Sequence, residues 1–312
     1  MAVEAVGIAA FIAALKEKKA LGNECPHRLW LIGGGGAFNG AYLAGVQVAL
    51  VEAGLHLSLS GVIGVSTSIP ALGYLLAARQ GETERHIYET TTYSVEARSR
   101  LFVKWYGRTD AAWLRSVFEG VTGKPIRYDR VMSSGVRFVG VATEWATGRP
   151  QYIEPTSRDE FFTLIEAGCS MPGLSPPVYL RDSPMTDSVT GDPSPVPWLM
   201  SLPTSERPTH VLFVTNAWHE PPKRARQVRE WLLLRFIHRR TVPRHIIDRF
   251  ALRHRRFYRG VATAIKRSDV EVAILWLPWR QRPLERNSRK ITALTKAGYE
   301  HVCELISKSD TT

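Results

Sequence analysis

Two short segments rich in glycine and serine hold the residues of this 312-residue chain that could do chemistry. One is GGGGAFNG at residues 33–40, and the other is GVSTS at residues 64–68. The second resembles a nucleophile elbow of the form GxSxG, a sharp strand-to-helix turn that exposes a serine hydroxyl at the positive end of a helix. Glycines in the first leave backbone N–H groups bare, and such groups stabilise a developing oxyanion. The pair predicts acyl transfer with Ser66 as nucleophile, an elbow framed by Gly64 and Ser68, and an oxyanion hole formed by Gly34, Gly35, Gly36 and Ala37.

Nucleotide binding is the other chemistry that a glycine-rich turn can serve. A phosphate-binding loop of the Walker type needs Gly-Lys-Ser/Thr at its end, but this one ends Asn39-Gly40-Ala41. A dinucleotide site needs an acid near the end of the next strand, and no Asp or Glu occurs between Glu52 and Glu82. We therefore expect no nucleotide and no organic cofactor.

Short apolar runs alternate with helical patterns around both segments. Such alternation predicts a mainly parallel sheet covered by helices on both faces, with the chemistry at the carboxyl ends of the strands. The composition, 44% hydrophobic and 22% charged, is that of a globular protein and excludes disorder. Strands are predicted over 29–33, 62–65, 136–143, 151–153, 211–215 and 270–277, helices over 41–53, from the elbow to 78 and over 289–307, and an irregular loop over 172–208.

The two segments, together with CSMPGLSPPVYLRDSPMTDSVTGDPSPV at residues 169–196, resemble the patatin-like phospholipase family. Members are serine lipid acyl hydrolases that use a Ser–Asp dyad. The resemblance covers roughly Leu29 to Pro197 and the last helix. It implies a three-layer α/β/α fold in one domain, with Asp187 as the base that accepts the proton of Ser66. The implied activity is cleavage of acyl esters of membrane phospholipids.

Three positions depart from the family pattern. Asn39 stands where the family has Arg or Lys, Ser68 replaces the elbow glycine, and Ser188 replaces the glycine after the dyad aspartate. Ser68 risks crowding the turn, although a side chain this small can be tolerated there, and Ser188 brings the backbone geometry around Asp187 into question. These departures leave two alternatives open, a membrane-binding scaffold that has lost its activity and a transacylase that passes the acyl group to an alcohol.

Other residues could serve as the base. Asp182 and Asp192 lie in the same loop, where aspartates commonly form local backbone hydrogen bonds. A Ser–Asp–His triad could use His210 or His219, but in α/β-hydrolases several strands precede the elbow and here only one strand is recognisable. The Ser–Asp dyad is therefore favoured.

Positive charge is concentrated in one part of the chain. Between Lys223 and Arg259 there are 13 Lys/Arg and two acids, whereas the remaining residues carry 28 basic and 27 acidic side chains. Residues 220–267 are expected to form a basic amphipathic helical segment off the sheet, with an apolar stripe of Ile246, Phe250, Phe257 and Val261. Arginines interleaved with apolar side chains favour an anionic membrane surface over nucleic acid. The predicted membrane-binding residues are Trp231, Arg249, Arg253 and Arg256.

Alternatively, the apolar stripe of this segment packs on the protein's own sheet and leaves a solvated basic face. Residues 1–28 are expected to form an N-terminal helical extension without the charge order of a secretory signal. Cys25, Cys169 and Cys303 are far apart in sequence, which argues against a disulfide framework and against a metal site. These features predict a cytoplasmic protein bound peripherally to membrane.

Overall fold

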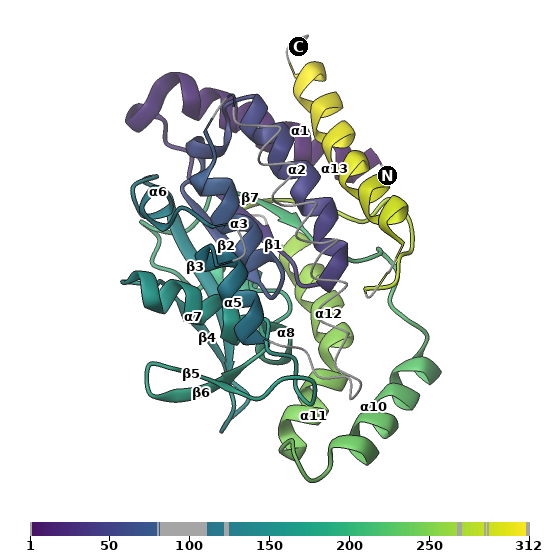
Figure 1. Ribbon diagram of the computed structural model, residues 1–312. Coiled ribbons are helices and arrows are strands. Elements are labelled where there is room, and N and C mark those ends of the chain that lie inside the picture. Colours follow the sequence, from purple (N-terminus) through teal and green to yellow (C-terminus); the bar gives the residue numbers. More distant parts are fainter. Residues whose placement is uncertain are drawn as a thin grey trace.

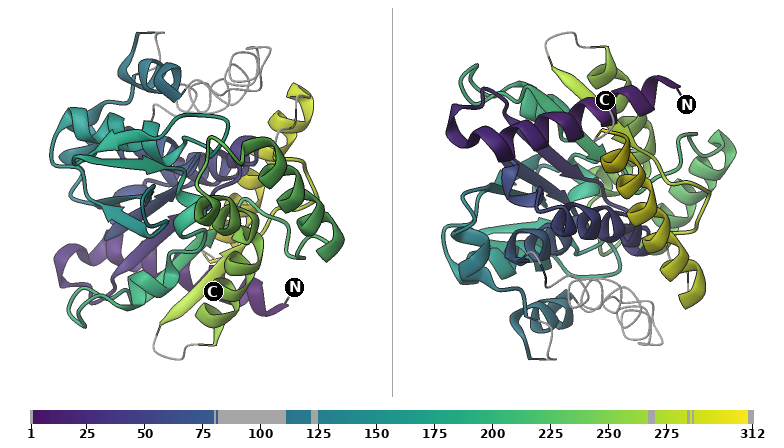
Figure 2. Two further views of the ribbon diagram at one scale, coloured as in Figure 1. Left: turned by 90° about the horizontal axis from the view of Figure 1, so that it is seen from below. Right: turned by 90° about the horizontal axis from the view of Figure 1, so that it is seen from above.

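An eight-stranded, mainly parallel sheet forms the centre of the computed structural model (Figure 1). Its strand order is β5-β6-β3-β2-β1-β7-β8, and β4 pairs with β3 outside this path. The structure describes residues 2–79, 81, 111–121, 125–266, 270–283, 285 and 287–309. The fold is α/β with helices on both faces of the sheet, as the alternation of apolar runs predicts (Figure 2).

The strands that position the candidate site run parallel. β1 pairs with β2 on one side and with β7 on the other, so that Leu31 lies beside both Val62 and Leu212. All five residues of β1 and of β2 are buried, because helices cover both sides of each strand. The strands are β1 (Leu29–Gly33), β2 (Gly61–Val65), β3 (Arg137–Glu144), β4 (Pro150–Ile153), β5 (Val178–Leu180), β6 (Ser183–Thr186), β7 (His210–Val214) and β8 (Glu271–Leu275).

The larger of the two helical layers packs on one face of the sheet. Its α-helices are α1 (Ala2–Leu21), α2 (Gly40–Glu52), α3 (Ser68–Ala77), α5 (Ala111–Glu119), α6 (Tyr128–Met132), α7 (Arg158–Gly168) and α13 (Ser288–Lys308). Short 3-10 turns lie at η1 (Gly22–Glu24), η2 (Ala37–Asn39) and η3 (His56–Ser58). The N-terminal helix belongs to this layer, since Phe11, Ile12 and Leu15 are buried in the same apolar core as β1 and α2. Residues 1–28 therefore contribute to the core through α1.

The opposite face of the sheet is covered by α9 (Val196–Met200) and α12 (Arg253–Ile265). Phe257 and Val261 of α12 are buried against Ile32 and Phe213 of the sheet. The expectation that residues 220–267 leave the sheet altogether is therefore wrong for α12, because the apolar stripe of this helix is part of the second core. For α12, the structure agrees with the alternative that the apolar stripe packs on the protein's own sheet.

The rest of the basic segment forms α10 (Arg224–His238) and α11 (Arg244–Ala251). Leu252 separates α11 from α12. In Figures 1 and 2, α10 projects from the side of the body. The loop predicted over 172–208 is more ordered than expected and contains β5, β6, α8 (Ser188–Gly191) and α9. In the described part of the chain, no helix combines the length and the apolar character needed to cross a bilayer.

Candidate active site

The elbow lies between β2 and α3. Ser66 has a φ of 54°, in the left-handed region that side chains other than glycine rarely adopt. Gly64 is required because a Cβ there would lie 2.6 Å from Cα of Ile69. Strained backbone at such a turn costs on the order of 1–3 kcal/mol and persists only where the surroundings impose it. The turn holds the Ser66 hydroxyl at the carboxyl end of β2.

Asp187 lies beside this hydroxyl although 121 positions separate the two residues. Oγ of Ser66 donates a hydrogen bond to Oδ2 of Asp187 over 2.9 Å. The other carboxylate oxygen accepts the N–H of Val189 at 2.9 Å, so that Asp187 caps the amino end of α8. Its own N–H donates to the carbonyl of Ser170. These bonds fix both the backbone and the carboxylate of Asp187.

Burial changes the acidity of this carboxyl group. The side chain of Asp187 is 1% exposed, and loss of hydration raises its pKa to about 6. Hydrogen bonds from Val189 and Ser66 and the positive charge of Arg253 act in the opposite direction and lower it. At neutral pH the group is therefore ionised, yet it is a stronger base than a carboxylate in water.

The glycine-rich loop passes directly over the elbow. A Cβ on Gly35 would lie 3.4 Å from Cβ of Ser66 and 2.5 Å from a methyl group of Val189. The N–H of Gly34 is unavailable for an oxyanion, since it continues the sheet by donating to the carbonyl of Val214 at 2.8 Å. Gly34 therefore has to be removed from the predicted oxyanion hole.

The remaining members of the predicted hole are Gly35, Gly36 and Ala37. Within the described residues, their N–H groups make no hydrogen bond. Ala37 has a φ of 48°, a second left-handed residue beside the elbow. An N–H group that is bare at this place is what an oxyanion hole requires.

Ser68 joins the two segments and does not crowd the turn. Its buried hydroxyl donates to the carbonyl of Gly34 at 2.6 Å and accepts a hydrogen bond from Nδ2 of Asn216 at 3.2 Å. The same amide nitrogen donates to the carbonyl of Gly34 at 2.7 Å. The sequence analysis did not identify Asn216, whose one signal in the sequence is a polar residue two positions after the end of β7.

Ser188 has a similar role on the side of Asp187. Its hydroxyl oxygen accepts the N–H of Ser66 at 3.0 Å and donates to backbone carbonyls of Val141 and Gly168. A glycine at this position would lack all three contacts. The replacement therefore ties the loop of Asp187 to the elbow.

Asn39 is buried and contacts Asn216, the residue that also binds Ser68. Its side-chain nitrogen donates to the carbonyl of Asn216 at 3.4 Å, so it supports the glycine-rich loop from behind. Among the described residues its side-chain oxygen has no hydrogen-bond partner. Asn39 holds neighbouring backbone and offers no cation to the site.

The alternative bases lie in other settings. Asp182 occupies the turn between β5 and β6 with a φ of 60°, and Asp192 accepts hydrogen bonds from the Tyr152 hydroxyl and the Ser194 N–H. His210 begins β7 at the edge of the sheet opposite to Ser66. His219 is half exposed in a loop, 3.8 Å from Glu220.

Two arginines predicted to bind membrane make polar contacts inside the chain, and one of them, Arg256, supports the loop that follows Asp187. The guanidinium of Arg256 donates to the carbonyls of Val189, Thr190 and Gly191 at 3.3, 2.5 and 2.6 Å. Burial lowers its pKa to about 10. Arg253 is paired with Glu230 at 2.5 Å. Arg256 is turned inward because the carbonyls of α8 need donors, whereas Arg253 donates to the carbonyl of Phe250 at 2.8 Å and to Glu230.

Trp231 and Arg249 also contact the protein. Nε1 of Trp231 donates to Oδ1 of Asp248 at 2.7 Å. The aliphatic chain of Arg249 packs over Gly148, where a Cβ would lie 2.6 Å from Cδ of the arginine. All four residues predicted to bind membrane thus make contacts within the chain, and Arg256, whose guanidinium is occupied by three backbone carbonyls, has to be removed from the predicted membrane face.

Cys169 is a further neighbour that the sequence did not single out. Its thiol is in hydrogen-bond contact with Ser66, and burial together with the charge of Asp187 raises its pKa. The thiol therefore stays protonated and makes an apolar wall beside the hydroxyl.

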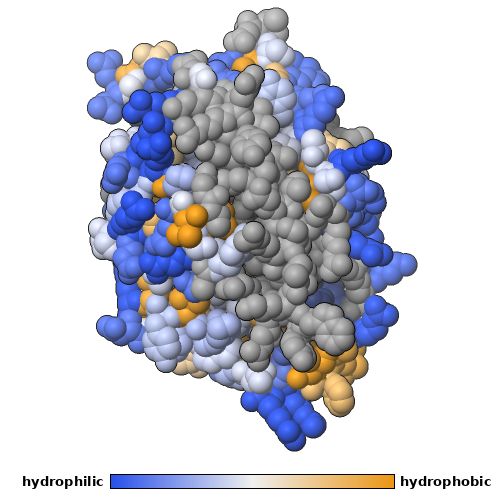
Figure 3. Space-filling view, viewed as in Figure 1, coloured by the Kyte–Doolittle hydropathy of each residue, from blue (hydrophilic) through white to orange (hydrophobic). Residues whose placement is uncertain are grey.

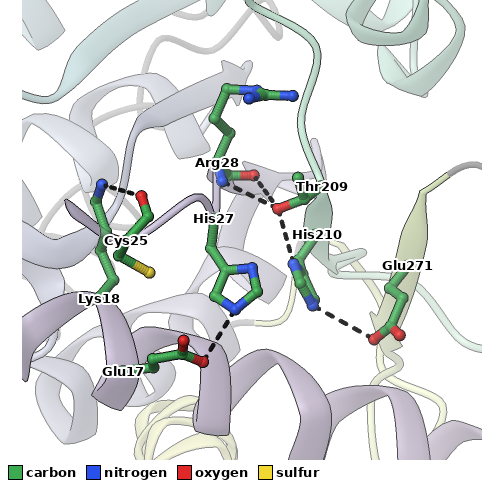
Figure 4. A network of polar contacts seen from close by, with 8 residues as sticks. All are labelled: Glu17, Lys18, Cys25, His27, Arg28, Thr209, His210 and Glu271. Carbon is green, nitrogen blue, oxygen red and sulfur yellow. Dashed lines mark hydrogen bonds and ion pairs between the residues drawn. The ribbon is translucent and has the colours of Figure 1, made fainter. Parts of the chain in front are cut away.

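A second polar cluster lies at the amino edge of the sheet (Figure 4). Nε2 of His27 lies 3.0 Å from a carboxylate oxygen of Glu17, and the rings of His27 and His210 meet edge to face at 4.9 Å. Donor atoms of Glu17, Cys25 and His27 lie within 4.8 Å of one another, the one group among the described residues that could hold a metal. The cluster joins α1 to the amino ends of β1 and β7 and takes no part in the Ser66 geometry.

Comparisons with known proteins give only distant similarities. A scan of protein-family models finds no match, and a search of curated proteins finds none. The structure of VipD from Legionella pneumophila has a TM-score of 0.45 and 10% identity over 91% of this chain and 68% of that one. The type III effector protein ExoU gives 0.36 and 11% over 92% and 54%, and full-length ExoU in its complex with SpcU from Pseudomonas aeruginosa gives 0.29 and 12% over 78% and 53%. The chain spans about half the length of ExoU.

Proposed function

We propose that the chain is a patatin-like serine lipid acyl hydrolase that cleaves acyl esters through the dyad of Ser66 and Asp187. The observation that carries the proposal is the 2.9 Å hydrogen bond from the serine hydroxyl to a carboxylate that is almost fully buried. The N–H groups of Gly35, Gly36 and Ala37, which have no partner among the described residues, support the same function.

The reaction begins when Asp187 accepts the proton of Ser66 and the serine oxygen attacks the ester carbonyl. The N–H groups of Gly35, Gly36 and Ala37 stabilise the resulting oxyanion. Asp187 then gives its proton to the leaving alcohol, and an acyl-serine remains. A water molecule that loses its proton to Asp187 attacks this ester and releases the fatty acid and the free serine.

A pKa of about 6 suits Asp187 to this exchange of protons. General-base catalysis works best when the pKa of the base lies near the working pH. A carboxylate of ordinary acidity would return the proton to the alcohol efficiently but would accept it from serine poorly. Burial, which raises the pKa, thus supplies part of what a histidine supplies in a triad.

Phospholipids are the proposed substrate class, which makes the enzyme a peripheral membrane protein. The departures at Ser68 and Ser188 fit an active site, since both hydroxyls bind neighbouring backbone and brace the elbow. We therefore prefer the hydrolase to a scaffold without activity. A transacylase would use the same acyl-serine with an alcohol in place of water.

The test is release of fatty acid from phospholipid vesicles by the parent chain, by Ser66→Ala and by the matched surface variant Ser205→Ala. We expect Ser66→Ala to abolish release and Ser205→Ala to retain it. Equal release by all three chains would refute the assignment of Ser66, and no release by any would support the scaffold. Transfer of the acyl group to added glycerol at the expense of free acid would show a transacylase.

A further inference from the structure

Helix α10 carries apolar side chains on two faces, and only one of these faces packs against other residues that the structure describes. On the inner face, Trp231 and Leu234 pack against a small apolar cluster of Val242, Ile246 and Ile247. The hydrogen bond from Trp231 to Asp248 fixes this face to α11. A helix whose apolar side chains extend around most of its circumference normally has a partner on each side.

The outer face of α10 is exposed. Five apolar side chains on it are between 47% and 73% exposed, namely Val228, Leu232, Leu233, Phe236 and Ile237. Their spacing of four, one, three and one places them on one side of a helix. Hydrophobic residues gather at the lower edge of the face shown in Figure 3, where Figure 1 places α10. Contiguous apolar surface on this scale marks an interaction site more often than a solvated face.

Positive charge surrounds this outer face. Seven Lys/Arg and one acid lie between residues 223 and 240. The acid, Glu230, is already paired with Arg253. Arg239, whose guanidinium lies 5.8 Å from the ring centre of Phe236, and Arg240 are exposed beside the apolar side chains.

The position of α10 relates this face to the dyad. α10 packs on α11, and α11 packs on α8, the short helix capped by Asp187. At its carboxyl end the ring of His238 covers Gly173, in the loop that follows Ser170. Helix α10 therefore lies on the same side of the molecule as α11 and α8, the helices next to the carboxylate of Asp187.

We propose that the outer face of α10 docks on an anionic lipid bilayer. Apolar side chains flanked by arginines match a surface in which acyl chains lie beneath acidic headgroups. A second copy of the chain would bring arginines against arginines, and nucleic acid would leave the five apolar side chains in water. The proposal deepens the proposed function, because it names the surface on which the lipid substrate is met.

This surface replaces the one predicted from the sequence. Trp231, Arg253 and Arg256 hold the segment to the body, and Phe236, Ile237 and their neighbours meet the lipid. The inner contacts hold α10 on α11, and within the described part of the chain its outer face stays exposed.

The experiment measures co-sedimentation with vesicles in the Ser66→Ala chain, so that lipid is not consumed. The vesicles are phosphatidylcholine alone, or phosphatidylcholine mixed with phosphatidylserine. The test variant adds Phe236→Gln and Ile237→Gln. The matched control adds Leu57→Gln and Ile265→Gln, which remove two exposed apolar side chains elsewhere. A third chain adds Arg239→Gln and Arg240→Gln.

We expect the parent to bind the mixed vesicles more tightly, and the Phe236/Ile237 variant to lose about tenfold or more of that affinity. The control should bind like the parent, and the arginine variant should lose about fivefold for each charge on mixed vesicles only. Circular dichroism establishes that each variant is folded.

Undiminished binding by the folded Phe236/Ile237 variant would overturn the proposal. So would a parent that binds no vesicle but forms a dimer that this variant dissociates, since a second copy would then cover the face. The hydrolase assignment is judged separately, by cleavage of a short soluble ester by the chain with Ser66 intact. Cleavage without vesicle binding would reject the docking surface alone, and vesicle binding without cleavage would reject the hydrolase alone.

Discussion

The two edges of the central sheet each place a carboxylate beside a possible proton donor, and they differ in burial. At the carboxyl edge Asp187 lies 2.9 Å from the Ser66 hydroxyl and is 1% exposed. At the amino edge Glu17 lies 3.0 Å from His27, and their side chains are 49% and 25% exposed. Burial raises the pKa of Asp187 to about 6, whereas solvated groups keep most of their hydration. The residue types at the amino edge are at least as reactive, so burial and N–H groups without a partner among the described residues, rather than composition, distinguish the edge at which we propose catalysis.

The largest effect that separates the edges is expected in catalysis. Asp187→Asn keeps the shape of the side chain but removes the base, and we expect kcat/KM for ester hydrolysis to fall by about 10³-fold or more. Glu17→Gln, the matched change at the amino edge, should leave it unchanged. Initial rates with a soluble ester measure both, and equal losses would remove the distinction between the edges.

The second-largest effect is expected in stability, from the hydrogen bonds of Arg256 to the carbonyls of α8. Arg256→Gln leaves buried carbonyls of α8 without donors, and we expect it to lower the free energy of unfolding by about 2–4 kcal/mol. Arg28→Gln is its counterpart near the amino edge, where an arginine also donates to backbone carbonyls.

The Arg28 contacts are partly exposed, and their loss should cost about 1 kcal/mol or less. Urea denaturation compares the two variants. A cost for Arg28→Gln as large as that for Arg256→Gln would mean that burial of the carbonyls is not decisive.

The third effect is a pH-dependent gain in the free energy of unfolding when the buried carboxylate of Asp187 is replaced by an amide. Because the pKa of Asp187 is higher in the folded chain than its ordinary value of 3.8, the folded state binds more protons between about pH 4 and pH 6. The stability that this protonation supplies is complete below about pH 4 and is lost as the pH rises through about 6.

Asp187→Asn should therefore be more stable than the parent by about 1–3 kcal/mol at pH 8, and the difference should shrink at pH 4. Thermal or urea unfolding at the two pH values measures it. A variant that is less stable than the parent at pH 8 would contradict the buried charge as the origin of the raised pKa.

The smallest effect concerns the charge of Arg253, which lowers the pKa of Asp187. Arg253→Gln should raise that pKa, so the acid limb of the profile of kcat/KM against pH should move to higher pH by a few tenths of a unit. Arg137→Gln removes a partly buried arginine paired with Glu154 and Glu206 and serves as control. A shift to lower pH in Arg253→Gln would contradict the stated electrostatic effect.

Local patterns in the sequence predicted much of the fold. β1, β2, α2 and α3 follow from short apolar runs broken by glycine and serine, and the predicted parallel sheet is confirmed. Ser66 was predicted as the nucleophile because five consecutive residues, 64–68, define the elbow. The choice of Asp187 as the base came from the resemblance to a family.

Contacts between distant residues could not be predicted in this way. Nothing near Arg256 in sequence indicates that its donors lie on carbonyls about 65 positions away, or that Asn216 holds Gly34 and Ser68. The same limit explains why the basic segment was assigned to a membrane as a whole. Composition does not tell which face of α12 meets the sheet or which face of α10 stays exposed.

The central claim is most directly tested by labelling the chain with a fluorophosphonate probe and identifying the modified residue by mass spectrometry across pH. The account predicts a single adduct on Ser66, a labelling rate that rises with pH through about 6, and little labelling in Asp187→Asn. An adduct on another residue, or labelling of Ser66 at the parent rate in Asp187→Asn, would contradict it.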